Sequence, residues 1–355
     1  MENFNDNNNK HKNHYNDNNI GKSSASPLND YFVSIIIPLS VMNDYLLETL
    51  DHIFKMDFKN FEVIVLPDDK LELDYPNTTI ISTGKISPAK KRDIGAQYSK
   101  GNILAFIDDD AYPDSKWLTN AVPYFNDENI GAIGGPAITP DSDDFWQKVS
   151  GAVFLTKLGG GYPERYLSIG KVKEIDDWPS VNLLIKKKLF DKINGFDSEY
   201  WPGEDTKLCL DVINEGKKII YAPNVLVYHH RRPGLMKHLK QIGNYGLHRG
   251  YFAKKYPKNS FRLPYFFPTF LVLYFLILII LLISGINENI LLLFSVGLLI
   301  YIGALCFAFF DINRKVRSLK ISFVSIYYIF LTHIWYGIRF FYGFFILKDL
   351  KSKLR

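Results

Sequence analysis

The first part of the chain alternates short apolar runs with stretches that carry apolar residues at helical spacing. Buried strands are predicted where runs of apolar, often β-branched residues are bounded by turn residues. They lie at 33–37, 61–66 and 103–107, with a shorter one at 79–82. Helices are predicted between them, at 44–54 and 88–98. This alternation is typical of a parallel sheet with right-handed crossovers.

The pattern is less regular from residue 130 to residue 232. Predicted strands lie at 130–138, 182–185, 218–221 and 225–228. Predicted helices lie at 145–156, 187–192 and 204–214, and the glycines at 159–161 are predicted to be flexible. These elements extend the α/β pattern, so one large domain is expected over residues 31–232.

From residue 264 the pattern changes to apolar stretches long enough to cross a bilayer. Crossings are predicted at 264–284 and 289–310, and a third apolar segment covers 321–347. Basic residues precede the first crossing and follow the second, which by the positive-inside tendency places the preceding domain in the cytosol. Length favours a third crossing, although it would put the basic tail at 348–355 outside. The alternative is that 321–347 lies partly in the membrane interface.

Two further segments complete the expected domain organisation. Residues 1–30 are Asn-rich and poor in apolar side chains, so they cannot offset their ordering entropy and are predicted to be disordered. Residues 233–263 form a basic juxtamembrane segment, and its predicted helix at 238–255 has the amphipathic pattern of a helix at a membrane surface. The membrane region at 264–347 then contains two or three helices.

Composition adds information mainly about compartment and partners. The 355 residues carry a formal net charge of +5, and the basic residues cluster at 217–262 and after 311. That placement indicates a negatively charged membrane surface or phosphate groups as partners, and no nucleic acid. The only cysteines, Cys209 and Cys306, provide neither a disulfide framework nor zinc-like spacing, and are expected to be inert packing residues.

Acidic residues follow the predicted strands at positions where open α/β sheets bind ligands. Asp108, Asp109 and Asp110 come directly after the strand at 103–107. Three adjacent carboxylates repel one another unless a cation or protons relieve them, and Mg²⁺ or Mn²⁺ suits such oxygen ligands. The alternative is a solvated acidic turn that caps the next helix. Further acidic pairs are Asp68-Asp69, Asp176-Asp177 and Glu204-Asp205.

Taken in order, these stretches resemble the inverting glycosyltransferases of family 2, which use the GT-A fold. The matching stretches are VSIIIP, FEVIVLPDD, KKRDIGAQYSKGNILAFIDDDAYPD, NLLIKKKLFDKINGFD and WPGEDTKLCLDVINEGKKIIYAPNVLVYHH. Five matches in the right order, over roughly residues 31–232, are a specific signal. The resemblance implies a Rossmann-like, mostly parallel sheet flanked by helices, followed by C-terminal transmembrane helices.

The resemblance also implies roles for individual residues. Asp108 and Asp110 resemble the D-x-D pair that holds Mn²⁺ or Mg²⁺ against the donor diphosphate, and Asp205, beside Glu204, resembles the catalytic base. The other implied contacts are Asp68 or Asp69 with the nucleotide base, Lys91 and Arg92 with the nucleotide, and His229 or His230 with the metal or diphosphate. Asp109, between the two residues of the D-x-D pair, is expected to point away or to contact the donor sugar or ribose. The residues alone leave other roles open, because Glu204-Asp205 could cap a helix and Asp68-Asp69 could form a turn.

The implied activity is transfer of one sugar from a nucleotide-sugar, expected to be a UDP-sugar, to a glycan or lipid-linked acceptor in cell-envelope glycan biosynthesis. The enzyme would be membrane-anchored and multi-pass, with its catalytic domain in the cytosol. Its chemistry needs a metal to stabilise the leaving diphosphate and a carboxylate to take the acceptor's proton. Transfer to a polyprenyl phosphate and a degenerate, non-catalytic membrane scaffold are the alternatives.

Three departures from the family pattern bear on the details. Residues 39–43 replace the usual nucleotide-holding turn, and Asp93 stands where Asn is common, so the nucleotide contacts are not fixed by the resemblance. The Q-x-x-R-W signature of processive synthases is absent. A single sugar transfer is therefore expected rather than polymerisation.

Overall fold

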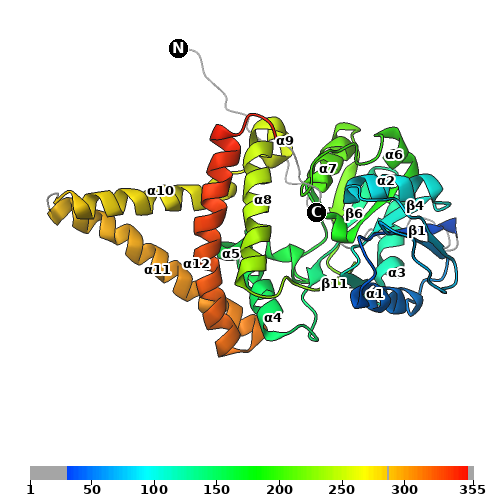
Figure 1. Ribbon diagram of the computed structural model, residues 1–355, viewed down its shortest axis with the longest axis horizontal. Coiled ribbons are helices and arrows are strands. Elements are labelled where there is room, and N and C mark those ends of the chain that lie inside the picture. The colour runs from blue at the N-terminus through cyan, green and yellow to red at the C-terminus, as the bar shows by residue number, and fades with distance from the viewer. Residues whose placement is uncertain (1–29, 286–287, 351–355) are drawn as a thin grey trace, which may run out of the picture.

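The protein combines a mixed α/β domain with a group of long helices, in a computed structural model that describes residues 30–285 and 288–350 (Figure 1). The predicted disordered segment at 1–30 lies almost wholly outside these residues, as do the last five residues of the predicted basic tail.

Within the described residues, the main sheet has eight strands in the order β3-β2-β1-β4-β9-β6-β10-β8. Neighbours are parallel from β3 to β4 and between β6 and β10, whereas β9 runs antiparallel between β4 and β6, and β8 runs antiparallel at the edge. The strands are β1 (Val33–Pro38), β2 (Phe61–Leu66), β3 (Thr78–Ile80), β4 (Ile103–Phe106), β6 (Ile130–Gly134), β8 (Lys173–Ile175), β9 (Leu183–Lys186) and β10 (Lys218–Tyr221).

A small second sheet lies at the carboxyl edge of the main one. It has the order β5-β11-β7, with β5 (Ala111–Pro113) antiparallel and β7 (Ala137–Ile138) parallel to β11 (Val227–His229). Because β5 follows β4 after only four residues, this sheet fixes the backbone that leaves the central strand.

Helices cover both faces of the main sheet. Side chains alternate along β1, so Ile35 and Ile37 pack on one face and Ile36 on the other. The first face is covered by α1 (Asp44–Phe54) and α3 (Trp117–Ala121), and the second by α2 (Pro88–Tyr98), α6 (Lys187–Lys192) and α7 (Glu204–Asn214). Strands buried on both faces explain the continuous apolar runs in the sequence.

Several helices begin at side chains that satisfy free backbone N–H groups. Asn43 caps α1 by accepting from Leu46 N at 3.0 Å, and Ser87 caps α2, with Pro88 in its first turn. Asp144 and Gln147 form a capping box at the start of α4 (Phe145–Ala152). The boundaries of these helices therefore follow from local sequence.

The C-terminal part consists of long helices. The element α8 (Leu235–Lys255) lies beside α12 (Leu319–Phe341), and the two are seen next to each other in Figure 1. Between them in sequence come α9 (Pro257–Ser260), α10 (Leu263–Ile283) and α11 (Glu288–Val316). Within the described residues, three segments are long and apolar enough to cross a membrane, namely Leu263–Ile283, Glu288–Val316 and Leu319–Ile346.

The expected fold class, a sheet of parallel strands flanked by helices and followed by long apolar helices, is confirmed. Some details of the prediction were wrong. The strand expected at 130–138 is divided into β6 and β7 around Pro136, which has no N–H for a sheet ladder. Strands β5 and β8 were not predicted, and residues 157–160, expected to be partly flexible, form the short helix α5 (Lys157–Gly160). The last strand covers 227–229 rather than 225–228.

Candidate active site

The pairing of β5 with β11 brings two distant segments together. Ala111 lies opposite His229 in this antiparallel pair, and His230 N donates to the carbonyl of Asp110 at 3.0 Å. Residues after β4 therefore lie next to residues at the end of β11, although more than a hundred positions separate them in sequence.

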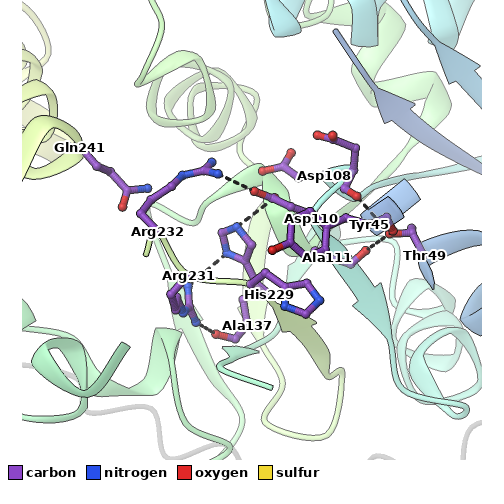
Figure 2. Close-up of polar contacts among 12 residues, drawn as sticks. Tyr45, Thr49, Asp108, Asp110, Ala111, Ala137, His229, Arg231, Arg232 and Gln241 are labelled. Carbon is purple, nitrogen blue, oxygen red and sulfur yellow. Dashed lines mark hydrogen bonds and ion pairs between the residues drawn. The ribbon is translucent and has the colours of Figure 1, made fainter. Parts of the chain in front are cut away.

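Asp108, Asp110 and His229 form a cluster at this junction, which we call the Asp–Asp–His cluster (Figure 2). Each residue contributes one potential ligand atom, and these atoms lie within 4.8 Å of one another. His229 Nε2 is 3.1 Å from Asp110 Oδ1, and Arg232 Nη1 donates to Asp110 Oδ2 at 2.8 Å. Two carboxylates and an imidazole at this spacing can hold a divalent cation.

The hydrogen bonding of His229 bears on whether it can hold a cation at this position. Arg231 Nη1 lies 3.1 Å from His229 Nδ1, and a guanidinium can only donate, so Nδ1 accepts in this structure. His229 Nε2 is buried and makes no hydrogen bond of good geometry within the described residues. A cation bound to Nε2 would require the tautomer in which Nδ1 carries the proton, so the contact between Arg231 and Nδ1 would have to break.

The neighbouring carboxylates are held in different protonation states. Burial alone would raise the pKa of Asp110, but His229 and Arg232 lower it below its usual range. Burial and the charge of Asp110 raise the pKa of Asp109 to about 7. Asn43 Nδ2 donates to Asp109 at 2.6 Å, so Asp109 is directed toward the start of α1.

Glu204 and Asp205 lie at the first turn of α7, the second acidic part of the site. Gly203 precedes them with φ of 109°, and a Cβ there would come within 2.2 Å of Phe252 on α8, so both its conformation and its contact require glycine. Arg92 joins the two acidic parts, because Nη2 donates to Asp108 at 2.6 Å and Nη1 donates to Glu204 at 3.1 Å.

Both carboxyl groups of α7 hold protons more tightly than ordinary carboxyls. Burial and the charge of Asp205 raise the pKa of Glu204 to about 7, against the effect of Arg92. Burial and the nearby charge of Asp177 raise the pKa of Asp205. A raised carboxyl pKa brings such a group closer to the pH at which a general base is most effective.

A buried ion-pair group lies behind Asp205. Asp177 accepts from Arg165 at 2.9 Å and from Thr206 Oγ1 at 2.9 Å, and Arg249 Nη2 lies 2.8 Å from it. Burial opposes ionisation of Asp177, but the two arginines lower its pKa below its usual range. Because Arg249 comes from α8, the juxtamembrane helix contributes directly to the surroundings of the α7 carboxylates.

His230 faces away from the Asp–Asp–His cluster. Its Nδ1 lies 2.5 Å from Asp143 and its Nε2 lies 2.8 Å from Glu48. Although burial lowers the pKa of His230, these two carboxylates raise it above its usual value. Of the two histidines left open by the sequence, His229 is therefore the one beside Asp110.

The predicted nucleotide contacts lie in two places. Asp68, at the end of β2, forms an ion pair with Lys91, which also donates to the carbonyls of Leu39 at 2.5 Å and Leu66 at 3.1 Å. Asp69 is exposed next to it. Lys91 thus holds Asp68 and the backbone at the end of β2, and Arg92, one residue later, holds Asp108 just after β4.

Glu48, Asp143 and Arg165 were not predicted as part of the site. They come from α1, from the loop before α4 and from the 163–165 turn, so no local spacing in the sequence identifies them. Asp177 and Arg249 were noticed only as parts of charged runs. Each of these residues gains its partner through long-range packing.

Two cavities border these groups. A small one of about 60 Å³ lies beside the cluster and is lined by residues that include His229, Arg231, Arg232, Gln241 and Tyr245. A larger one of about 490 Å³ lies around β8, and none of the cluster residues lines it. The small cavity therefore adjoins the Asp–Asp–His cluster, and α8 forms part of its wall, whereas the larger one adjoins Arg165 and Asp177 behind Asp205.

Comparison with known proteins finds a family similar to part of the chain. Residues 34–193 match the family model described as glycosyl transferase family 2. A relative from Methanococcus voltae, a dolichyl N-acetyl-alpha-D-glucosaminyl phosphate 3-beta-D-2,3-diacetamido-2,3-dideoxy-beta-D-glucuronosyltransferase, is 22% identical over 256 residues, which cover 67% of this chain and 78% of the relative. The pre-mycofactocin glycosyltransferase of Mycobacterium tuberculosis is 24% identical over 173 residues, covering 49% of this chain but only 36% of that protein.

Among solved structures, a mannosyltransferase from Pyrobaculum calidifontis in complex with GDP-Man and Mn²⁺ is similar at a TM-score of 0.45 and 18% identity. The match covers 62% of this chain and 63% of that one. The family match thus covers residues 34–193, which include most of the main sheet and Asp108 and Asp110 but not His229 or the α7 carboxylates.

Proposed function

We propose that this protein is a membrane-anchored, metal-dependent, inverting glycosyltransferase that moves one sugar from a nucleotide-sugar to a glycan or lipid-linked acceptor. The observation that carries the proposal is the Asp–Asp–His cluster at the carboxyl edge of the sheet, joined through Arg92 to the carboxylates of α7. The Asp–Asp–His cluster has the ligands for a cation that would bind the diphosphate, and the carboxylates of α7 include a candidate base.

Asp108, Asp110 and His229 would hold Mn²⁺ or Mg²⁺. When bound, such an ion supplies positive charge that stabilises the diphosphate as it leaves the sugar. Arg232, whose guanidinium already lies against Asp110, would add positive charge at the same place. The donor is expected to be a UDP-sugar.

Asp205 would accept the proton of the acceptor hydroxyl as that oxygen attacks the anomeric carbon. The C–O bond to the nucleoside diphosphate breaks on the opposite face, so a single displacement inverts the anomeric centre. Glu204, held by Arg92, would keep Asp205 and the metal ligands in one arrangement. General-base assistance of this kind contributes roughly 10²–10⁴-fold to rate.

The remaining predicted donor contacts belong to the same proposal. Asp68 or Asp69 would contact the nucleotide base, and Asp109 the sugar or ribose. Lys91 and Arg92 have carboxylate partners within the protein, so we propose that they act on the donor mainly by holding Asp68 and Asp108 in place.

Membrane anchoring is supported by the three long apolar helices, and a lipid-linked acceptor by the dolichyl-phosphate-linked substrate of the Methanococcus relative. The basic residues around α8 and after α11 support placement of the catalytic domain in the cytosol. A soluble domain at 31–232, a juxtamembrane segment at 233–263 and a membrane region at 264–347 are the proposed domains.

The proposal is tested by a thermal-shift screen of purified protein with nucleotide-sugars, with and without Mn²⁺. The correct donor should raise the melting temperature by mass action, and only in the presence of the metal. Donor hydrolysis or transfer should then be measured with that nucleotide-sugar. Asp141→Ala, which removes an exposed acid, is the matched control for Asp108→Ala and Asp110→Ala.

Loss of turnover in both cluster variants with retention in Asp141→Ala supports the proposal. No turnover with any donor in the wild-type protein would support a non-catalytic scaffold instead. A phosphate acceptor is already ionised, so transfer that survives Asp205→Asn would indicate that a polyprenyl phosphate is the acceptor.

A further inference from the structure

The three apolar helices differ in how they are covered by protein. In their most apolar stretches, only 17% of the residues of α10 and 6% of those of α11 are buried, compared with 39% in the third segment. The exposed positions of α10 and α11 are distributed around each helix. Helices that are apolar on all sides need lipid on all sides.

The helix α12 instead has one exposed and one covered side. Its exposed residues recur every three to five positions and form one apolar stripe, with Lys320 as the one charged residue among them. The stripe consists of Leu319, Phe323, Tyr327, Phe330, Trp335, Ile338 and Tyr342, and continues to Phe345 and Ile346. The covered side includes Ser322, Ser325, Thr332 and His333, so α12 is amphipathic.

The covered side of α12 lies along α8. His238 Nε2 lies 2.9 Å from Thr332 Oγ1, and Arg339 Nε donates to the carbonyl of Gly243 at 3.3 Å. Farther along, a Cβ on Gly250 would lie 2.3 Å from the carbonyl of Phe340. The contacts advance together along both helices, so α8 and α12 run parallel and in close contact over most of their length.

The helix α8 cannot itself enter the hydrocarbon. It carries Lys237, Lys240, Lys254 and Lys255, and it is attached to the catalytic domain by the contact between Arg249 and Asp177. A lysine at the bilayer centre costs roughly 2.5–3.5 kcal/mol on insertion scales. Because α12 is parallel to α8 and touches it, a crossing by α12 would draw these charges into the bilayer.

The arrangement in space agrees with this constraint. In Figure 1, α10 and α11 extend away from the catalytic domain and converge at their far ends, while α8 and α12 lie side by side across the base of this pair. Tyr274 OH donates to the carbonyl of Phe294 at 2.6 Å, which joins α10 to α11. The 21 residues of α10 give it a length of roughly 31 Å, close to the thickness of the hydrocarbon core.

We propose that only α10 and α11 cross the membrane, and that α12 lies in the membrane plane on the catalytic side with its apolar stripe in the lipid interface. The proposal rests on the membrane anchoring of the proposed function, and its partner is the acyl–headgroup boundary of the bilayer. Because α8 and α12 share this plane, Lys348, which follows α12, stays on the side of the catalytic domain, as the positive-inside tendency favours.

The topology is tested by cysteine labelling of the full chain in sealed vesicles whose catalytic domain faces outward. In a Cys306→Ser background, single cysteines replace Ser284 after α10, Ser318 between α11 and α12, and Lys348 after α12. Cysteine at Lys59 reports the catalytic side. A membrane-impermeant maleimide should label positions 59, 318 and 348 directly, and position 284 only after detergent is added.

Protection of position 348 until detergent is added would mean that α12 crosses, and direct labelling of position 284 would mean that α10 and α11 do not. Either result overturns the proposal. The readout does not depend on turnover, so it is separate from the proposed chemistry. Release of the whole protein by carbonate washing would contradict both the membrane anchoring and the crossing by α10 and α11, and would leave the proposed chemistry untouched.

Depth along α12 provides a second test. Nitroxide labels at Phe323, Tyr327, Ile338 and Tyr342, all on the stripe, should show similar shallow depths when oxygen and a soluble nickel chelate compete as relaxing agents. A crossing helix would place the first and last of these labels roughly 28 Å apart in depth, because an α-helix rises about 1.5 Å per residue. A steep depth gradient with a maximum in the middle would overturn the in-plane arrangement.

Discussion

The site contains two pairs of acidic residues that experience opposite electrostatic environments. Asp110 is buried, yet His229 and Arg232 lower its pKa, so it stays ionised. Glu204 is also buried and Asp205 is half-buried, but each has a carboxylate neighbour, and burial raises the pKa of both. Burial alone therefore does not decide the charge of a carboxylate; the balance of cations and other carboxylates beside it also matters.

This difference suggests a division of labour within one site. An ionised carboxylate suits a metal ion and a diphosphate, whereas a carboxylate with a raised pKa suits proton transfer. Arg92 contacts one member of each pair, Asp108 and Glu204, and so keeps the two environments adjacent but distinct. Substitutions in each pair should therefore affect metal binding and proton transfer separately.

Replacing Asp110 by alanine should lower transfer by about 10³–10⁴-fold, because the metal supplies several kcal/mol of charge stabilisation. Mn²⁺ binding, followed by the loss of the free-ion EPR signal, should weaken in parallel. Asp141→Ala should leave both unchanged. Normal Mn²⁺ affinity in the Asp110 variant would show that Asp110 is not a metal ligand.

Replacing Asp205 by asparagine should lower kcat by about 10²–10⁴-fold, since a base would be lost. Mn²⁺ and donor affinities should stay within about twofold of wild type, as the metal ligands and their arginine partners are untouched. Rate and affinity should be measured on the same preparation. Loss of both together would show that the two acidic pairs are not functionally separate.

Replacing Arg92 by leucine should destabilise the catalytic domain by about 3 kcal/mol, because the buried carboxylate of Glu204 and the half-buried one of Asp108 lose their shared cation. Thermal unfolding in detergent, followed by near-ultraviolet circular dichroism, measures the change. Lys90→Leu, at an exposed position on the same helix, is the control. An unchanged melting temperature would mean that Asp108 and Glu204 do not need this bridge.

The rate should also depend on pH through Asp205. Burial and Asp177 raise the pKa of Asp205, so it is protonated at a higher pH than an ordinary aspartate. With saturating donor and Mn²⁺, kcat should fall about tenfold per pH unit below the apparent pKa. Arg249→Gln removes a cation that favours the ionised form, and should move this acid limb to higher pH. If the acid limb of the kcat profile does not move in this variant, Arg249 does not influence the pKa of the catalytic base.

The smallest effect is expected for the stability contribution of Asp93. This carboxylate is largely buried and accepts a hydrogen bond from Phe196 N at 2.8 Å. Burial raises its pKa to about 6, above the usual 3.8, so the folded state binds this proton more tightly than the unfolded state. Stability is therefore lost as pH rises from about 4 to about 6. Asp93→Asn should stabilise the protein by about 1 kcal/mol at pH 8 and by almost nothing at pH 4, as measured by thermal unfolding.

Much of the catalytic core was predictable because its signals are local. Strands buried on both faces produce apolar runs such as 103–107, and the caps at Asn43 and Ser87 mark helix starts through their own side chains. Asp108 and Asp110 were singled out because they follow a strand that ends at one edge of the sheet, whereas Asp205 was singled out through the resemblance to family 2 glycosyltransferases. The inserted antiparallel strand β9 was not foreseen as antiparallel, since strand direction depends on partners more than 75 residues away in sequence.

The sequence by itself determined the alternation of strands and helices, the acidic positions at the sheet edge and the existence of long apolar C-terminal segments, because each depends on neighbouring residues. Only the tertiary structure decided which histidine lies beside Asp110, since the register of β11 against β5 sets which side chain faces the cluster. It also decided the environment of Asp205, because Arg165 and Arg249 reach Asp177 from distant elements. The same holds for the contact of α12 with α8, because the way two helices pack against each other depends on long-range contacts that no local pattern contains.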